Sequence, residues 1–218
     1  MQAAEILATV DHTLLKQTAT WSEIQRICEE AKAYHTATVM VPSCFIARIR
    51  QTYGEAVKAA TVVGFPNGNC STAAKLAETA QALADGAAEI DMVINIGALK
   101  SGDTKYVTDE IRALKALCGE RVLKVIVETC FLTEEEKIAA CRCVTEGGAD
   151  FIKTSTGFGT AGATLADIKL FREHIGPQVQ MKAAGGIHTR QEMEAFLAAG
   201  CTRLGASAAV KVLKEEMG

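Results

Sequence analysis

Three lysines occur at an interval of 29 residues, each within an apolar run: Lys124 in VLKVIVET, Lys153 in DFIKTSTG and Lys182 in VQMKAAGG. A buried ammonium is costly unless it is paired or loses its proton. Neighbouring buried ammonium groups lower each other's pKa, and a neutral amine at physiological pH is a nucleophile that forms Schiff bases with carbonyl compounds. The three lysines therefore indicate amine chemistry on a carbonyl substrate.

An aspartate is expected close to these lysines. Because alternate side chains of a strand share a face, the run AEIDMVINIG at 88–97 places Asp91 toward the same pocket as Lys124, Lys153 and Lys182. A carboxylate among ammonium groups offsets part of their desolvation and can relay protons. A purely structural ion network is the alternative, although stability alone rarely favours burying so many charges.

Glycine and hydroxyl residues cluster after the last three expected strands, at 154–157 (TSTG), 184–186 (AGG) and 205–207 (GAS). Backbone N–H groups that such turns expose beside helix N-termini bind anions. In α/β barrels the loops after the seventh and eighth strands are frequent phosphate sites. These clusters predict that the pocket binds a phosphate group.

Short apolar runs rich in β-branched residues alternate with longer amphipathic stretches along the whole chain. The pattern predicts strands near 7–11, 37–41, 60–64, 88–94, 122–128, 150–153, 179–183 and 201–204. It predicts helices that include 21–33, 71–85, 104–118, 133–146, 164–174 and 189–199. Helix starts are marked by Ser71 or Thr72 and by two capping boxes, Thr133 with Glu136 and Thr189 with Glu192.

Eight strand–helix units in 218 residues correspond to about 27 residues per unit. The sequence therefore predicts an α/β fold, a single (β/α)8 TIM barrel over residues 1–218 with few insertions. The alternative is an open doubly wound sheet. Against it, no Gly-x-Gly-x-x-Gly motif follows the first strand, and polar residues recur at several strand ends rather than at one switch point.

Composition excludes several classes of function. The net charge is −3 and basic residues are not clustered, so a nucleic-acid partner is not expected. No apolar run approaches the roughly 18 residues that span a bilayer, and the N-terminus lacks the basic region of a signal peptide. The eight cysteines include no Cys-x-x-Cys pair. We therefore expect reduced thiols in a cytoplasmic protein, with no metal site and no membrane partner.

Other polar residues are less specific. The triplet DHT at 11–13 follows the first expected strand, and the sequence leaves open whether it lines the pocket. His35, His174 and His188 are expected to be surface or structural residues rather than catalytic ones.

Several segments together resemble the deoxyribose-phosphate aldolase family of Schiff-base (class I) aldolases over nearly the full chain. The segments at 84–103 and 149–164 are the most specific of these. The matching segments are DHTLLK at 11–16, VGFPNG at 63–68, ADGAAEIDMVINIGALKSGD at 84–103, LKVIVETCFLTEEEK at 123–137, ADFIKTSTGFGTAGAT at 149–164, KAAGGIHT at 182–189 and RLGAS at 203–207.

The resemblance implies a role for each central residue. Lys153 would form the Schiff base, Lys182 beside it would lower its pKa, and Asp91 would work with Lys182 and an ordered water in proton transfer. The implied reaction is the reversible cleavage of 2-deoxy-D-ribose 5-phosphate to acetaldehyde and D-glyceraldehyde 3-phosphate. A protonated imine accepts the electrons of the breaking carbon–carbon bond, so no metal or organic cofactor is implied.

The resemblance also implies a pocket for a small phosphorylated sugar or aldehyde. Lys124 is expected to line this pocket. The other substrate-binding residues would be Thr156, Gly157, Gly185, Gly186, Gly205 and Ser207. Members of the family usually form homodimers, which is the assembly expected for this chain.

The chain departs from the family pattern at three places. Met40 stands where many members have a pocket cysteine that reactive aldehydes can trap, so greater aldehyde tolerance is expected if Cys44 points elsewhere. Ala208 stands where a second phosphate-loop serine is common, and one lost hydrogen bond would weaken binding by about 1 kcal/mol. The chain ends in KEEMG without the C-terminal tyrosine of some members, so proton transfer is expected to depend more on Asp91, Lys182 and water.

Two alternatives stay open on the sequence alone. Another Schiff-base aldolase or a transaldolase would also use a reactive lysine, but it would prefer a donor other than acetaldehyde. A catalytically inactive barrel that binds sugar phosphates would keep the glycine clusters, yet it would have no need for Asp91, Lys153 and Lys182. Binding without turnover would indicate the inactive barrel.

Overall fold

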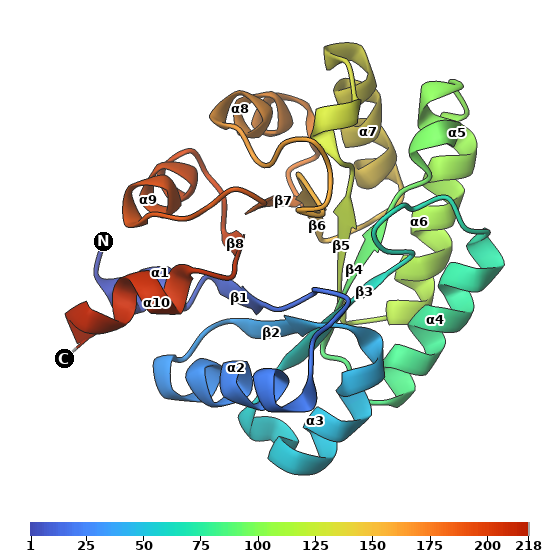
Figure 1. Cartoon of the computed structure of the whole chain (residues 1–218). Helices are drawn as coiled ribbons and strands as arrows, with labels where there is room; N and C mark the ends of the chain where they lie inside the picture. Colours follow the sequence, from blue (N-terminus) through green and yellow to red (C-terminus); the bar gives the residue numbers. More distant parts are fainter. Residues whose placement is uncertain (218) are drawn as a thin grey trace.

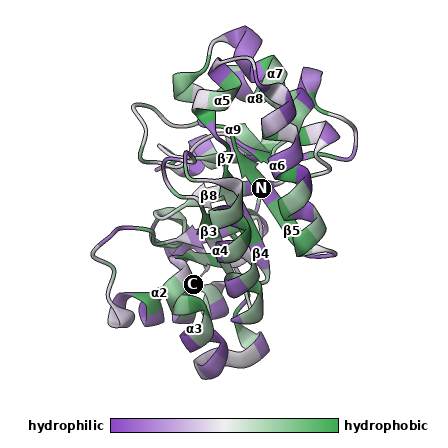
Figure 2. Cartoon of the chain, turned by 90° about the vertical axis from the view of Figure 1, so that its right-hand side faces the viewer, coloured by the Kyte–Doolittle hydropathy of each residue, from purple (hydrophilic) through white to green (hydrophobic). Residues whose placement is uncertain are grey.

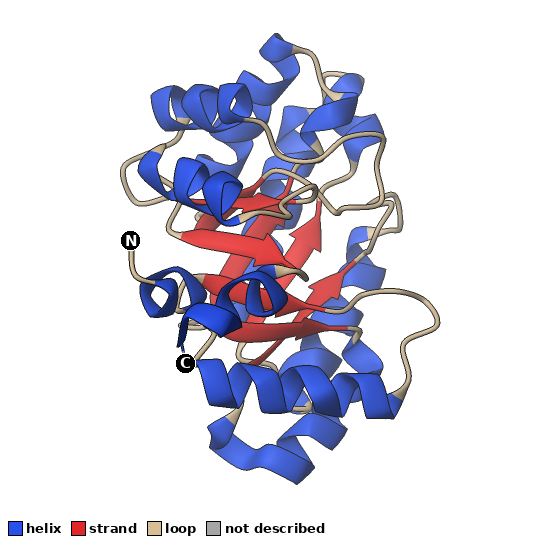
Figure 3. Cartoon of the chain, turned by 60° about the vertical axis from the view of Figure 1, so that its left-hand side comes forward, coloured by secondary structure: helices blue, strands red, loops and turns tan. Residues whose placement is uncertain are grey.

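The strands of the chain close into a parallel barrel. In the computed structural model, which describes residues 1–217, the strands are hydrogen-bonded in chain order and β8 pairs with β1 to close the ring. Figures 1 and 3 show the strands at the centre, the helices around them, and both termini on the same side. The strands are β1 (Val10–Thr13), β2 (Thr38–Val41), β3 (Ala59–Val63), β4 (Glu89–Val93), β5 (Val122–Ile126), β6 (Phe151–Lys153), β7 (Gln180–Ala184) and β8 (Arg203–Ala206). The predicted (β/α)8 TIM barrel is confirmed.

The helices surround the strands (Figure 1), and all except α1, which precedes β1, follow a strand in the chain. Those described are α1 (Ala3–Leu7), α2 (Trp21–Tyr34), α3 (Ile46–Tyr53), α4 (Thr72–Ala84), α5 (Ile96–Lys100), α6 (Thr104–Cys118), α7 (Glu134–Glu146), α8 (Leu165–His174), α9 (Arg190–Ala198) and α10 (Ala209–Leu213), with 3-10 turns η1 (Ser43–Phe45), η2 (Gly54–Ala56), η3 (Thr129–Phe131) and η4 (Lys214–Met217). Both predicted capping boxes are present, at the N-termini of α7 and α9. The hydroxyl of Ser71 caps α4 by accepting from the Ala74 N–H.

The strand register sets the levels of the three central lysines. Lys153 on β6 is the Cα partner of Lys182 on β7, so these two residues share a level. Lys124 on β5 is the partner of Asp91 on β4 and of Phe151 on β6, two residues before Lys153. Equal spacing along the chain therefore does not give equal levels, and Lys124 lies one side-chain layer nearer the N-terminal ends of the strands.

The apolar core lies mainly between the strands and the helices. Strand residues such as Ile90 and Ile152 are fully buried there. In Figure 2 the strands are coloured mainly as hydrophobic, whereas hydrophobic and hydrophilic residues alternate along the helices around them. A smaller apolar cluster of Met40, Ala60 and Val62 comes from β2 and β3.

The N-terminal segment differs from the prediction. A strand is expected at 7–11, but Ala3–Leu7 forms α1 and β1 starts at Val10. A capping box between Gln2 and Glu5 starts this helix. The hydrophobic pattern of its five residues is too short to distinguish a helix from a strand. The helix ranges predicted from the sequence do not include α3, α5 and α10, because eight or fewer residues show too few periods.

Residue 218, the last residue of the predicted single domain, lies outside the described residues. Across the part of the chain that is described, none of the helices combines the length and the apolar character needed to cross a membrane.

Candidate active site

The amine of Lys153 lies at the C-terminal end of β6, where it borders a cavity. The residue is 3% exposed, and its Nζ donates a 2.9 Å hydrogen bond to Asp91 Oδ2. The cavity measures about 330 Å³ and is formed by segments that end or follow β1, β6, β7 and β8. This is the face at which (β/α)8 barrels place their active sites.

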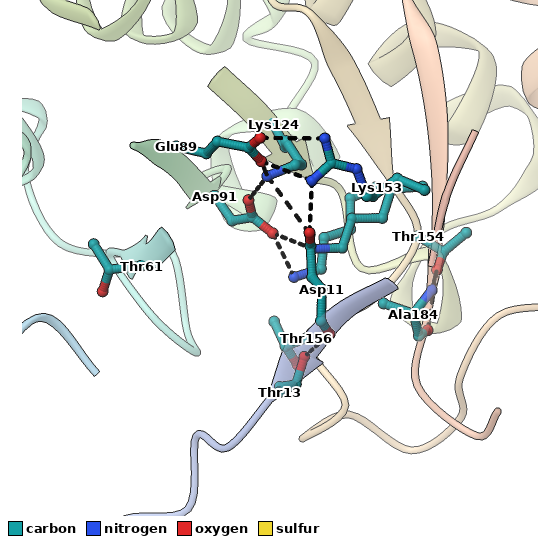
Figure 4. Close-up of polar contacts among 12 residues, drawn as sticks. Asp11, Thr13, Thr61, Glu89, Asp91, Lys124, Lys153, Thr154, Thr156 and Ala184 are labelled. Atoms are coloured by element: carbon teal, nitrogen blue, oxygen red, sulfur yellow. Dashed lines mark hydrogen bonds and ion pairs between the residues drawn. The ribbon is translucent and has the colours of Figure 1, made fainter. Parts of the chain in front are cut away.

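Asp91 on β4 connects the three lysines that the sequence analysis selected. Its Oδ1 accepts a 2.8 Å hydrogen bond from Lys124. Its Oδ2 accepts from both Lys153, at 2.9 Å, and Lys182, at 2.8 Å. Figure 4 shows dashed contacts from the Asp91 carboxylate to Lys124 and to Lys153. The structure therefore brings together the aspartate and the three lysines that strand alternation predicted to face one pocket.

The triplet at 11–13, which the sequence left open, divides into three environments. Asp11 is fully buried, and its carboxylate accepts hydrogen bonds from Lys182 and Thr38. His12 is buried as well, but its Nε2 pairs with Glu30 Oε2 at 2.6 Å. Thr13 lines the cavity. The first strand thus contributes Asp11 to the ionic cluster and Thr13 to the cavity wall.

Two charged residues that sequence reasoning missed extend the cluster toward the N-terminal ends of the strands. Glu89 on β4 pairs with Lys124 at 2.5 Å. Arg203 on β8 bonds Glu89 at 2.9 and 3.2 Å and Asp11 Oδ1 at 2.6 Å. Figure 4 shows Glu89, Lys124 and Asp11 joined by these contacts. The signal for Glu89 was available, because Glu89 and Asp91 alternate on one face of β4.

The formal charges of this cluster nearly cancel. Its three carboxylates are Asp11, Glu89 and Asp91, and its four cationic side chains are those of Lys124, Lys153, Lys182 and Arg203. Loss of one proton from a lysine balances the cluster. Lys153 has one carboxylate partner, whereas Lys182 has two and Lys124 has three. Lys153 is therefore the amine that is least stabilised as a cation.

The pKa directions agree with this charge balance. Burial is the largest cause that lowers the pKa of Lys153 to about 8; the ammonium groups of Lys182 and Lys124 add to it, and Asp91 opposes it. The neighbouring ammonium groups, which the sequence predicts as the cause, contribute less than burial. Burial alone would lower the pKa of Lys124, yet the surrounding carboxylates raise it above its ordinary value.

The carboxylates stay ionised for the complementary reason. Burial alone would raise the pKa of Asp91, but the three lysines hold it well below its usual range. Burial alone would also raise the pKa of Asp11, but Lys124, Lys182 and Arg203 outweigh burial and lower that pKa. Near neutral pH Asp91 and Asp11 are thus ionised, Lys124 is protonated, and Lys153 is an amine that readily loses its proton.

The cavity wall contains the predicted phosphate-site residues. These are Thr156, Gly157, Gly185, Gly186, Gly205 and Ser207. Gly185 and Gly186 have φ values of 81° and 74°, which favour glycine. The wall also contains residues outside the predicted phosphate site: Leu14, Leu15 and Lys16 after β1, Phe158 after β6, and Ile187 and His188 after β7. His188, expected to be a surface or structural residue, is exposed at this wall.

Lys124 does not line the cavity. It is fully buried, and its Nζ is held by carboxylates below the amine of Lys153. The register of β5 with β6 explains the difference, because it pairs Lys124 with Phe151 and Ile126 with Lys153. In residues 1–217, moreover, no three His, Cys, Asp or Glu side chains are arranged to hold a metal ion.

Comparison with known proteins agrees with this geometry. A family model described as DeoC/LacD family aldolase matches residues 6–217. The chain belongs to this aldolase family. It is 61% identical over 216 residues to the deoxyribose-phosphate aldolase of Clostridium botulinum (strain Alaska E43 / Type E3), with 99% of this chain and 98% of the relative covered. It is 50% identical to the deoxyribose-phosphate aldolase of Streptococcus pyogenes serotype M4 (strain MGAS10750), with 99% of this chain and 97% of the relative covered. The resemblance seen in the sequence is confirmed, and the chain is a carbon–carbon lyase.

Solved structures of aldolases share the fold. QR15, described as an aldolase, has a TM-score of 0.92 and 32% identity, with 97% of this chain and 96% of that chain covered. The deoxyribose phosphate aldolase from Aeropyrum pernix has a TM-score of 0.90 and 27% identity, with 100% and 93% covered, and is described as tetrameric.

Two departures from the family pattern can be located in this aldolase. Met40 is fully buried in the apolar cluster of β2 and β3, which Leu15 and Phe65 also contact. Cys44 is exposed in η1, and none of the described residues that line the cavity is a cysteine. Ala208 directly follows Ser207 and precedes α10 without a side-chain cap.

Proposed function

We propose that the aldolase reversibly cleaves 2-deoxy-D-ribose 5-phosphate to acetaldehyde and D-glyceraldehyde 3-phosphate through a Schiff base on Lys153. The observation that carries the proposal is a buried amine with a lowered pKa at the edge of a cavity whose wall is rich in glycine turns. The relatives named deoxyribose-phosphate aldolase support the choice of substrate.

The reaction begins with the neutral amine. Lys153 Nζ attacks the C1 aldehyde of the open-chain sugar, and loss of water gives an iminium ion. The C3 hydroxyl then loses its proton, the C2–C3 bond breaks, and its electron pair moves into the iminium to leave an enamine. D-Glyceraldehyde 3-phosphate departs, C2 of the enamine takes up a proton, and water hydrolyses the resulting iminium to release acetaldehyde and the free amine.

The ionic cluster suits these steps. The iminium carries the same charge as protonated Lys153, so Asp91 at 2.9 Å from Nζ stabilises both species without rearrangement. Lys182 shares the same Asp91 oxygen, and we assign to Asp91 and Lys182 the proton transfers at the C3 oxygen and at C2. Lys124 holds the other Asp91 oxygen and acts from below the cavity. Its expected role as a wall residue becomes a positioning role.

The glycine turns provide the opposite end of the site. We assign the substrate phosphate to the wall formed by Thr156, Gly157, Gly185, Gly186, Gly205 and Ser207. Turn N–H groups bind phosphate without a net positive charge. Lys16 also lines the cavity, with its amine paired to Glu23 at 2.5 Å. Ala208 beside Ser207 provides no hydroxyl, so we expect phosphate binding weaker by about 1 kcal/mol than with a serine there.

The test is to trap the imine. The protein is incubated with acetaldehyde and borohydride, and the reduced adduct is located by peptide mass mapping. An ethyl adduct on Lys153, absent from Lys153→Ala, would establish both the Schiff base and acetaldehyde as donor. Folded protein without an adduct would refute the proposal and favour the inactive sugar-phosphate-binding barrel. An adduct formed only with another carbonyl donor would favour a different Schiff-base aldolase.

We also propose that the aldolase works in the cytoplasm as a homodimer. The cytoplasmic setting is supported by eight cysteines that are all free in the structure. The dimer is the assembly expected from the family, although the Aeropyrum pernix relative is described as tetrameric. Light scattering on the purified protein measures the assembly directly.

A further inference from the structure

Glu128, in the loop that follows β5, combines a left-handed backbone with a buried carboxylate. Its φ and ψ are 55° and 67°, values that residues other than glycine rarely adopt. The other non-glycine residue with a positive φ in residues 1–217 is His35, an exposed C-cap of α2, where such a conformation is common. Glu128 is 2% exposed. A strained, buried polar residue beside a cavity calls for a specific reason.

The carboxylate of Glu128 accepts hydrogen bonds from one residue of the cavity wall. The Thr156 N–H is 3.2 Å from both carboxylate oxygens, and the Thr156 hydroxyl donates to Oε2. The same hydroxyl oxygen accepts from the Phe158 N–H at 3.0 Å. A continuous set of hydrogen bonds thus joins Glu128 to the turn at 156–158, whose central Gly157 has φ 86°.

Two further contacts hold the loop of Glu128 against the segment that bears Lys153. The Val127 N–H donates to the Lys153 carbonyl at 3.1 Å, and the Thr129 N–H donates to the Thr154 carbonyl at 3.0 Å. On the far side of the turn, a Cβ at Gly159 would lie 3.2 Å from the Glu128 carboxyl carbon and 2.8 Å from Cys130 Sγ. The two loops are therefore in close contact around the carboxylate.

We infer that Glu128 is a positioning residue whose carboxylate holds the turn at 156–158 in the shape required to bind the substrate phosphate. Thr156, Gly157 and Phe158 all line the cavity, whereas the amine of Lys153 bonds Asp91 and not Glu128. Loss of the carboxylate thus loosens the phosphate wall and leaves the amine in place. This inference rests on the proposed function, because it assigns the substrate phosphate to this wall.

The test compares two substrates in variants that separate backbone from side chain. Glu128→Gly removes the carboxylate and keeps a residue that adopts a positive φ without strain. Glu128→Gln keeps the size and one acceptor oxygen. With 2-deoxyribose 5-phosphate, we expect Glu128→Gly to raise KM about tenfold and Glu128→Gln to raise it less. The kcat/KM for 2-deoxyribose, which lacks the phosphate, and the trapping of acetaldehyde on Lys153 should change less than twofold.

Glu110→Gln is the matched control. Glu110 is also a buried carboxylate, bonded to Lys75 at 2.7 Å and to the Thr72 hydroxyl at 3.0 Å, but it lies outside the cavity wall. Its replacement should lower stability without altering the preference for the phosphorylated substrate. A KM for 2-deoxyribose 5-phosphate that stays closer to wild type in Glu128→Gln than in Glu128→Gly would identify the acceptor oxygen as the feature that holds the turn at 156–158.

The outcomes separate this inference from the proposed function. If the unmodified protein forms no adduct on Lys153, both fail. If it forms the adduct and both Glu128 variants keep the wild-type preference for the phosphorylated sugar, only the role of Glu128 is overturned. Equal losses with both substrates, or a loss of trapping, would also overturn it, because the carboxylate would then act on the whole site. If Glu128→Gly does not fold, the same comparison between 2-deoxyribose 5-phosphate and 2-deoxyribose in Glu128→Gln decides the question.

Discussion

Replacement of Lys182 by methionine should raise the pKa of Lys153. The variant Lys182→Met keeps an unbranched side chain of similar length but removes the ammonium group. The ammonium group of Lys182 lowers the pKa of Lys153 directly. It also offsets part of the negative charge of Asp91, and that negative charge raises the pKa of Lys153. Both consequences of the substitution therefore act in the same direction, and Lys153 becomes harder to deprotonate.

The structure sets the size of the effect. Lys153 and Lys182 bond the same Asp91 oxygen, at 2.9 and 2.8 Å. Their nitrogens are thus no more than about 6 Å apart, and at an effective dielectric constant of about 20 two such charges repel by about 3 kcal/mol, or about two pKa units. A shift from about 8 to about 10 would reduce the neutral fraction at pH 7 by about 100-fold.

The assay is the initial rate of borohydride trapping with acetaldehyde between pH 6 and 10.5. Trapping reports imine formation, so it does not depend on the later proton transfers assigned to Lys182. The wild-type rate should rise through an inflection near pH 8, and the inflection for Lys182→Met should move upward. Lys75→Met is the control, since Lys75 is equally buried but pairs with Glu110. An unchanged inflection in Lys182→Met would refute the electrostatic reasoning.

Three further predictions concern stability and reactivity. Asp11→Asn should lower the free energy of unfolding by about 3 kcal/mol or more, because it leaves Lys182 and Arg203 short of a buried counter-charge; urea unfolding measures this, and a loss below 1 kcal/mol would contradict it. Excess acetaldehyde should leave most of the activity intact, because Met40 is no nucleophile for aldehydes and Cys44 is exposed away from the cavity wall; a cysteine adduct in the cavity, found by mass spectrometry, would show otherwise. Stability should fall as the pH rises above 9, the ordinary pKa of a thiol. Burial raises the pKa of Cys141 to about 12 in the folded protein, so above pH 9 this thiol stays protonated when folded and ionises when unfolded. The loss is about 1.4 kcal/mol per pH unit for each such thiol, and thermal unfolding at pH 8 and 10 under reducing conditions should show a smaller loss for Cys141→Ala than for the wild type.

The sequence alone was sufficient for the architecture and for the central residues. Alternating short β-branched runs and capped amphipathic stretches are local signals, and their order predicted the barrel. The alternation of side chains along each strand placed Asp91, Lys153 and Lys182 on the inner face without knowledge of the neighbours. Glycine clusters at 184–186 and 205–207 likewise report local turn geometry, and the structure places them in the cavity wall.

Only the tertiary structure decided the levels, partners and charge state of these residues. Lys124 lies below the cavity because the register of β5 with β6 pairs it with Phe151, a relation that spacing along one strand does not contain. Arg203, far along the chain, joins Glu89 across the barrel because closure brings β8 to β1. The pKa of Lys153 depends first on its burial and then on charges from other strands. Electrostatic energies depend on distances in space and on exclusion of water, and both arise only when the barrel closes.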